Sequence, residues 1–165
     1  MSVIDEVIRA NQEYARQHHL GHLSPRPRRR LAVLTCMDTR LSRATLGLAE
    51  GDAHILRNAG GIVTEDALRS LLISHYLLET EEFMVVNHTD CGLMQASEQE
   101  IRQRILSRTG SEAPPPASFH AFTDLDRNVR RQMEALRSHP WVPKEVAVRG
   151  FVYDVATGLL REVSV

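Results

Sequence analysis

Short apolar runs that alternate with helical patterns constrain the fold of this chain more than any other feature. Between the runs, apolar residues recur at helical spacing over 64–78, 97–106 and 124–136. Strands that are apolar throughout and separated by helices are typical of a parallel sheet that is covered on both faces. The sequence therefore predicts an α/β fold, with a mostly parallel central sheet of about four strands flanked by helices. The runs that we expect to form these strands are 31–35, 53–56, 83–86 and 146–155.

The end of the chain predicts one further strand. A Thr157-Gly158 turn follows the fourth apolar run, and segment 159–165 comes directly after it. A tight turn of this kind reverses the direction of the chain. We therefore expect 159–165 to pair as an antiparallel edge strand.

The length of 165 residues fits one domain, since chains divide at roughly 100 to 200 residues per core. We expect a single domain over 1–165, with an N-terminal helical arm and basic connection over 1–30 and an α/β core over 31–165. The arm begins with an amphipathic helix, with Ser2 as its N-cap. Its apolar face needs a cover, either the chain's own core or a neighbouring molecule. The residues of this face are Val3, Ile4, Val7, Ile8 and Tyr14.

The composition argues against several classes of function. Twenty basic and 21 acidic residues leave a formal net charge of -1, so no global field draws the chain to nucleic acid or anionic lipid. No apolar run reaches the ~18 residues of a membrane span, and the acidic start is unlike a signal or transit peptide. The only cysteines, Cys36 and Cys91, argue against a disulfide scaffold and favour a reducing compartment. We therefore expect a cytoplasmic protein without a nucleic-acid or membrane partner.

Polar residues follow each of the first three apolar runs. The sequence reads Cys-Met-Asp-Thr-Arg at 36–40, Arg-Asn-Ala-Gly-Gly at 57–61 and Asn-His-Thr-Asp-Cys at 87–91. In an open parallel sheet, ligands bind just beyond the carboxyl ends of the strands. We therefore expect the reactive groups of these three segments at one edge of the sheet.

Two cysteines and a histidine at this edge form a candidate metal site. Cys91 stands three residues after His88, so both can reach one ion, and the first strand can deliver Cys36 beside them. Thiolate and imidazole suit zinc, and three protein ligands leave a fourth position open, as in catalytic zinc sites. Taken alone, each cysteine is equally consistent with a buried, inert thiol.

Asp38 and Arg40 add a carboxylate and a guanidinium beside the candidate metal. Because one residue separates them, they can pair at the mouth of the first strand; a plain surface ion pair is the alternative interpretation. Asp38 can act as a fourth metal ligand, which closes the site, or be held by Arg40, which leaves that position to water. Such an exchange would switch the site between two states.

The three motifs together resemble those of the β-class carbonic anhydrases, in particular the compact prokaryotic branch of that family. The resemblance is carried by Cys-Met-Asp-Thr-Arg at 36–40, Arg-Asn-Ala-Gly-Gly at 57–61 and His-Thr-Asp-Cys at 88–91, in this order. It extends from residue 31 to the end of the chain. Thr39 stands where the family commonly has serine, which preserves a small hydroxyl group.

The resemblance implies a zinc enzyme. It implies that Cys36, His88 and Cys91 bind one Zn²⁺ per chain, and that Asp38 and Arg40 form a catalytic dyad. It also implies that Asp38 can become the fourth zinc ligand in a closed form, and that the chain assembles as a homodimer or a dimer-based oligomer.

The expected reaction is the reversible hydration of CO₂ to bicarbonate and a proton, the carbonate dehydratase activity of a lyase. Zinc-bound hydroxide would attack CO₂, oriented by Asp38 and Arg40. The N–H groups of Gly60 and Gly61, just before the helix that begins near Thr64, would bind bicarbonate or developing negative charge. Two alternatives stay open: hydrolysis of carbonyl sulfide or carbon disulfide at the same site, and a non-catalytic zinc-binding regulatory module.

Overall fold

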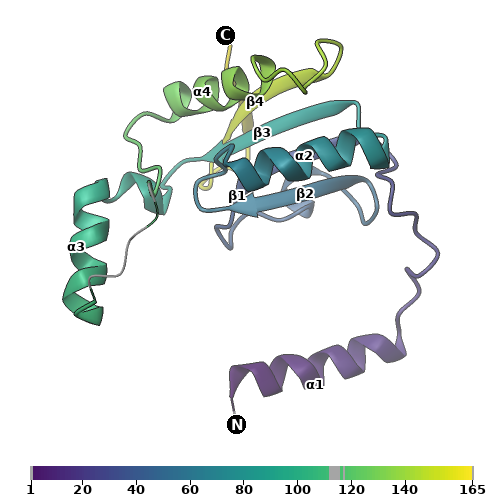
Figure 1. The fold of residues 1–165 in the computed structure, drawn as a ribbon. Helices are drawn as coiled ribbons and strands as arrows, with labels where there is room; N and C mark the ends of the chain where they lie inside the picture. Colours follow the sequence, from purple (N-terminus) through teal and green to yellow (C-terminus); the bar gives the residue numbers. More distant parts are fainter. Residues whose placement is uncertain (1, 112–115, 117, 165) are drawn as a thin grey trace.

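The chain forms a five-stranded sheet, seen at the centre of Figure 1. The computed structural model describes residues 2–111, 116 and 118–164. The strand order is β2-β1-β3-β4-β5, and only the β4–β5 pair is antiparallel. This confirms the predicted α/β fold with a mostly parallel sheet and an antiparallel edge strand. The strands are β1 (Leu31–Cys36), β2 (Ala53–Asn58), β3 (Glu82–His88), β4 (Ala147–Tyr153) and β5 (Leu160–Glu162).

The first three strands continue beyond their predicted ends into the polar motifs. Cys36 pairs with Asn58 across β1 and β2, and His88 pairs with Tyr153 across β3 and β4. The apolar pattern marks only the part of a strand that is buried by side chains, whereas backbone pairing continues as long as a neighbour is present. Strand β5 is shorter than the predicted 159–165, of which residue 165 lies outside the described residues.

Helices α2 (Glu65–Leu78) and α4 (Leu125–Arg137) pack on the same face of the sheet. Leu71 of α2 and Met133 of α4 are fully buried in one apolar cluster with Phe83 of β3. The opposite face is covered by the segment that follows β1, which contains the short 3-10 helix η1 (Ala44–Leu46) and not an α-helix.

The strand order places a topological switch between β1 and β3. The chain leaves β1 toward β2 on one side, and it leaves β3 toward β4 on the other. Connections that diverge in this way open a crevice at the carboxyl ends of the two strands. Cys36 and His88 are the last residues of β1 and β3 and therefore flank this crevice.

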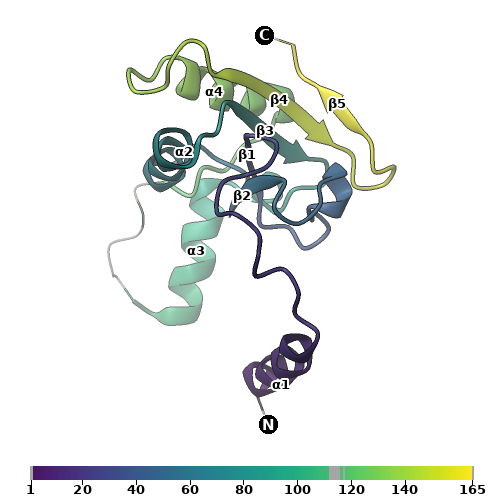
Figure 2. The same ribbon diagram turned by 90° about the vertical axis from the view of Figure 1, so that its right-hand side faces the viewer.

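The leading helix α1 (Val3–Arg16) lies apart from the sheet, as Figures 1 and 2 show. Ser2 and Asp5 form a capping box at its start, which satisfies backbone groups there without help from the core. No residue of α1 is buried, and its apolar side chains are exposed by 52% at Ile8 to 73% at Val3. In the described part of the chain, no helix is both long and apolar enough to cross a membrane.

Helix α3 (Glu98–Thr109) projects from the body of the molecule (Figure 1). Ser97 caps its start, and its last residue, Thr109, lies three residues after the predicted end at 106. Gly110 follows in the left-handed conformation. The carboxylate of Glu98 accepts hydrogen bonds from the N–H groups of Phe119 and Ala121. These bonds tie the returning chain to the start of α3.

Candidate metal centre

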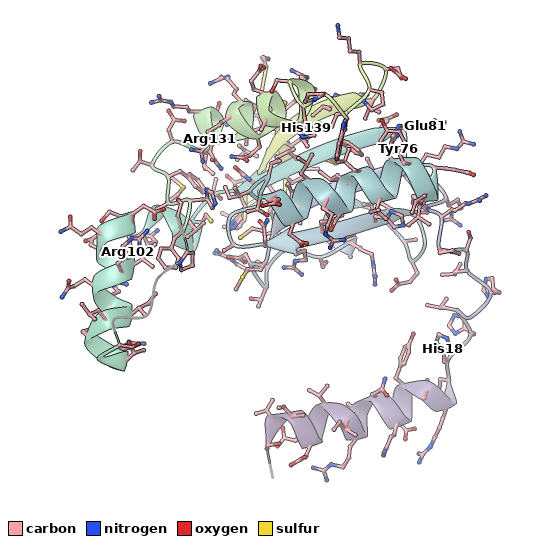
Figure 3. The ribbon with its side chains drawn as sticks, in the orientation of Figure 1. His18, Tyr76, Glu81, Arg102, Arg131 and His139 are labelled. Carbon is pink, nitrogen blue, oxygen red and sulfur yellow. The ribbon has the colours of Figure 1, made fainter. Side chains whose placement is uncertain are left out.

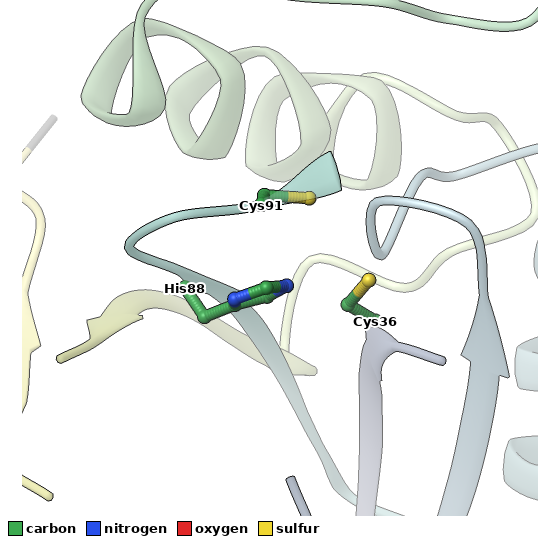
Figure 4. Close-up of side chains that lie close together, drawn as sticks. All are labelled: Cys36, His88 and Cys91. Atoms are coloured by element: carbon green, nitrogen blue, oxygen red, sulfur yellow. The ribbon is translucent and has the colours of Figure 1, made fainter. Parts of the chain in front are cut away.

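Cys36, His88 and Cys91 converge at the carboxyl ends of β1 and β3 (Figure 4). The first two are the last residues of their strands, and Cys91 precedes the 3-10 helix η2 (Gly92–Met94). Their ligand atoms all lie within 4.8 Å of one another, and all three residues are buried. The structure thus brings together the three residues that the sequence predicts as metal ligands.

The imidazole of His88 is oriented as a metal ligand would be. Its Nδ1 lies 2.9 Å from the carbonyl oxygen of Thr89, which can only accept a hydrogen bond and therefore fixes the proton on Nδ1. Its Nε2 then carries a free lone pair. Among the described residues, this Nε2 is the buried side-chain nitrogen or oxygen that lacks a hydrogen-bond partner. Such an atom is costly to bury, and a cation beside the two sulfur atoms would satisfy it.

The two thiols influence each other strongly. A hydrogen bond from the Cys91 thiol, followed by weaker ones that include the N–H of Gly60, lowers the pKa of Cys36. The same sulfur–sulfur contact, together with burial, raises the pKa of Cys91. The two sulfur atoms lie close enough to bind one soft divalent cation together. One imidazole nitrogen and two thiolates are a donor set that suits zinc.

The carboxylate of Asp38 is held by Arg40. Nε and Nη2 of Arg40 donate hydrogen bonds of 2.9 and 2.8 Å to the two carboxylate oxygens, and its backbone N–H adds a third of 2.9 Å. The side-chain hydrogen bonds, above all, keep the pKa of Asp38 well below its usual range. Nη1 of Arg40 also contacts Asp90 at 2.8 Å. In this structure Asp38 is therefore an ionised partner of Arg40, and it is not one of the three converging ligands.

Arg57 supports the backbone that carries these groups. Its guanidinium donates hydrogen bonds to the carbonyl oxygens of Cys36 and Asp38. The sequence places Arg57 in a motif but indicates no role for it. A cation directly after an apolar strand is the signal that could have pointed to this contact.

In this structure the N–H groups of Gly60 and Gly61 face acceptors within the chain. The N–H of Gly60 points at Sγ of Cys36, at 3.3 Å, and the N–H of Gly61 points at the carbonyl oxygen of Asn58, also at 3.3 Å. A role of these two N–H groups in binding bicarbonate stays a prediction. Their left-handed backbone, with φ of 83° and 61°, makes the tight turn between β2 and α2 and presses it against β1.

Comparison with known proteins gives a consistent match over the whole chain. Residues 31–160 match the model of the family described as carbonic anhydrase. Beta-carbonic anhydrase 1 of Mycobacterium tuberculosis is 39% identical over 99% of both chains. A crystal structure of carbonic anhydrase from Streptococcus mutans superimposes with a TM-score of 0.93 at 44% identity, covering 99% of both chains. A carbon disulfide hydrolase from Acidianus sp. is 36% identical, over 96% of this chain and 88% of its own.

Proposed function

Because this chain belongs to the β-carbonic anhydrase family, we propose that it catalyses the reversible hydration of CO₂ to bicarbonate and a proton with one zinc ion held by Cys36, His88 and Cys91. The observation that carries this proposal is the buried cluster with an unpartnered His88 Nε2, beside a carboxylate that Arg40 keeps ionised. A closed structural zinc site would have no use for that ion pair.

Each residue of the site has a distinct task in this reaction. When bound, zinc supplies a Lewis acid that lowers the pKa of a water molecule toward ~7. Asp38 accepts a hydrogen bond from the attacking water and so orients its lone pair toward the carbon of CO₂. Arg40 holds Asp38 in its ionised form and fixes its position through two parallel hydrogen bonds. Arg57 holds the backbone of the segment that carries both Cys36 and Asp38.

The experiment that tests the proposal combines metal analysis with stopped-flow CO₂ hydration on one preparation. We expect one zinc ion per chain and a hydration rate that rises from about pH 6 to about pH 9, around the pKa of ~7 that zinc gives its water. A fully zinc-loaded protein without hydratase activity across this range would contradict the proposal. It would favour a zinc-binding regulatory module instead.

A second candidate substrate is favoured by the relatives. Proteins named carbon disulfide hydrolase are 36% and 37% identical to this chain, and carbon disulfide, carbonyl sulfide and CO₂ are all linear molecules with an electrophilic carbon. The same site could therefore hydrolyse the sulfur compounds. Side-by-side assays of CO₂ hydration and of sulfide release from carbonyl sulfide and carbon disulfide separate the two functions.

We also propose that the chain forms a homodimer through α1. The apolar face of α1, which includes Val7 and Ile8, is exposed along its length. A groove of about 760 Å³ lies between α2 and the segment after α4. Its lining includes Tyr76 and His139, which Figure 3 labels, and the 69% exposed Trp141. In the proposed dimer, α1 of each copy packs its apolar face into this groove of the other copy.

The cytoplasm is the proposed location. Cys36 and Cys91 are both free thiols, and a reducing compartment keeps such thiols available to a metal.

A further inference from the structure

Three buried amide side chains connect helix α4 to the glycine turn beside Cys36. Gln132 and Asn128 lie one helical turn apart on α4, and Asn87 precedes His88 on β3. All three side chains belong to residues that are at most 3% exposed. Because an unpaired buried amide is costly, each of these three side chains needs hydrogen-bond partners.

The amides form a continuous chain of hydrogen bonds. The backbone N–H of Val63 donates to Oε1 of Gln132 at 2.8 Å, and Nε2 of Gln132 donates to Oδ1 of Asn128 at 2.9 Å. Nδ2 of Asn128 donates to Oδ1 of Asn87 at 2.7 Å, and Nδ2 of Asn87 donates to the carbonyl oxygen of Gly60 at 2.9 Å. The chain begins and ends in the same turn, so it closes a ring across residues 60–63.

The two ends of this chain fix the orientation of every amide. The N–H of Val63 can only donate, so it requires the oxygen of Gln132. The carbonyl oxygen of Gly60 can only accept, so it requires the nitrogen of Asn87. Asn128 satisfies both neighbours in one orientation only. An oxygen in place of the Asn128 donor would therefore face Oδ1 of Asn87, and the two acceptors would repel each other and displace Asn87.

The turn that this ring holds makes the contact with Cys36. The N–H of Gly60 lies 3.3 Å from Sγ of Cys36. The turn is packed tightly there, because a Cβ added at Gly61 would lie 3.0 Å from Nδ2 of Asn87 and 3.1 Å from the backbone of Thr35. A small change in the position of Asn87 would thus move the turn and the N–H that faces the sulfur.

We propose that Asn87, Asn128 and Gln132 are positioning residues for the metal centre. Through the ring they aim the N–H of Gly60 at the Cys36 thiolate, where its hydrogen bond holds the ligand in place and draws charge from the sulfur. The inference rests on the proposed function, because it requires Cys36 to bind zinc. It assigns a role in the site to α4, whose two amides reach the metal centre only through Asn87 of β3.

Two substitutions at Asn128 test the ring. Asn128→Leu removes the amide with little change in size. Asn128→Asp keeps the oxygen that accepts from Gln132 and Arg131 and replaces only the donor that meets Asn87, so it tests the link itself. The Arg131 guanidinium lies beside the new charge and offsets it. The matched control is Ser74→Ala, which removes an equally buried polar group. Its partners, His54 at the start of β2 and Thr80 just before β3, lie at the opposite end of these strands from the metal centre.

The readouts are zinc affinity, from competition with a chelator, and the thiolate-to-metal charge-transfer band of the cobalt-substituted protein. We expect both Asn128 variants to bind zinc about 10- to 100-fold more weakly than the parent chain, as is usual when a partner of a metal ligand is lost. We expect their cobalt band to move to longer wavelength, because a thiolate without its hydrogen bond is a stronger electron donor. Ser74→Ala should leave both readouts unchanged.

The outcomes separate this inference from the proposed function. Parent affinity and an unshifted band in folded Asn128→Asp would overturn the role of the ring. Equal losses in Ser74→Ala would also overturn it, since they would show a general effect of stability. A parent chain that binds no zinc would instead overturn the proposed function, and this inference with it.

Discussion

Oδ2 of Asp38 lies 3.8 Å from Nε2 of His88, while both oxygens of the same carboxylate are bonded to Arg40. Asp38 thus stands next to the ligand cluster without belonging to it. The predicted switch requires Asp38 to leave Arg40 and move to the cluster. The predictions that follow begin with this residue.

Asp38→Ala should retain zinc and lose CO₂ hydration by about 10²- to 10⁴-fold, the range for a positioned acid or base. The variant removes the group that orients the attacking water and leaves the three ligands in place. Stopped-flow hydration and metal analysis of the same sample measure both effects. Asp126→Ala is the matched control, because Asp126 forms a similar two-point pair with Arg161 outside the site. Full activity in Asp38→Ala would refute the dyad.

His88→Ala should reduce bound zinc from about one per chain to nearly none, because a catalytic zinc site has only three protein ligands to lose. Elemental analysis after dialysis measures the change. His75→Ala is the control: Nδ1 of His75 also lies close to a backbone carbonyl, that of Thr80, yet His75 is outside the cluster. Retention of zinc by His88→Ala would exclude His88 as a ligand.

Asp52→Asn should destabilise the fold at neutral pH and have little effect in acid. Hydrogen bonding to the N–H of Ala49, and then to Arg28, lowers the pKa of Asp52. The unfolded chain therefore binds more protons near pH 4, so the stabilisation is present above the ordinary carboxyl pKa of ~3.9 and is lost as the pH falls below it.

Thermal unfolding at pH 7 and in acid, with a chelator present throughout, measures this dependence. We expect a melting temperature a few degrees below that of the parent at pH 7 and a gap that narrows toward acid. Asp66→Asn removes an exposed pair with Arg69 within one helix and should change little at either pH. If the difference in melting temperature between Asp52→Asn and the parent grew toward acid, the predicted direction of the pH dependence would be wrong.

Ile8→Glu should convert the proposed dimer to a monomer, because it places a charge on the apolar face of α1. Trp141→Ala, on the groove, should weaken the dimer in the same way. Light scattering after gel filtration gives the mass of each species. Arg16→Glu changes the polar side of the same helix, and this variant should stay a dimer. A parent chain that is monomeric at all concentrations would rule out this assembly.

The sequence predicts the ligand cluster well because its residues follow apolar runs, and the ends of parallel strands must meet at one edge of the sheet. Cys36, Asp38 and His88 are placed by this rule alone. The strand ends themselves are less predictable, since pairing extends β1 and β3 into the polar motifs. Gly60 and Gly61 show the limit most clearly: their spacing predicts a turn, but not which acceptor their N–H groups meet.

The amide ring is the part of the site that the sequence pattern does not reveal. Asn128 and Gln132 lie on the same stripe of α4 as Val129 and Met133, and polar residues on a buried stripe are a signal that something must pair with them. Their partner, Asn87, comes from a distant strand, so only the packing of α4 on β3 brings the three together.

The position of the ligands on β1 and β3 also determines when a metal can arrive. Cys36 and His88 are far apart in the chain and become neighbours only after β1 and β3 have paired through five registered residue pairs. If this cluster binds zinc as we propose, the ion would therefore bind after the two strands have paired, unlike in a zinc finger, where the metal drives folding. A cell short of zinc would then contain this protein in a folded form without its metal.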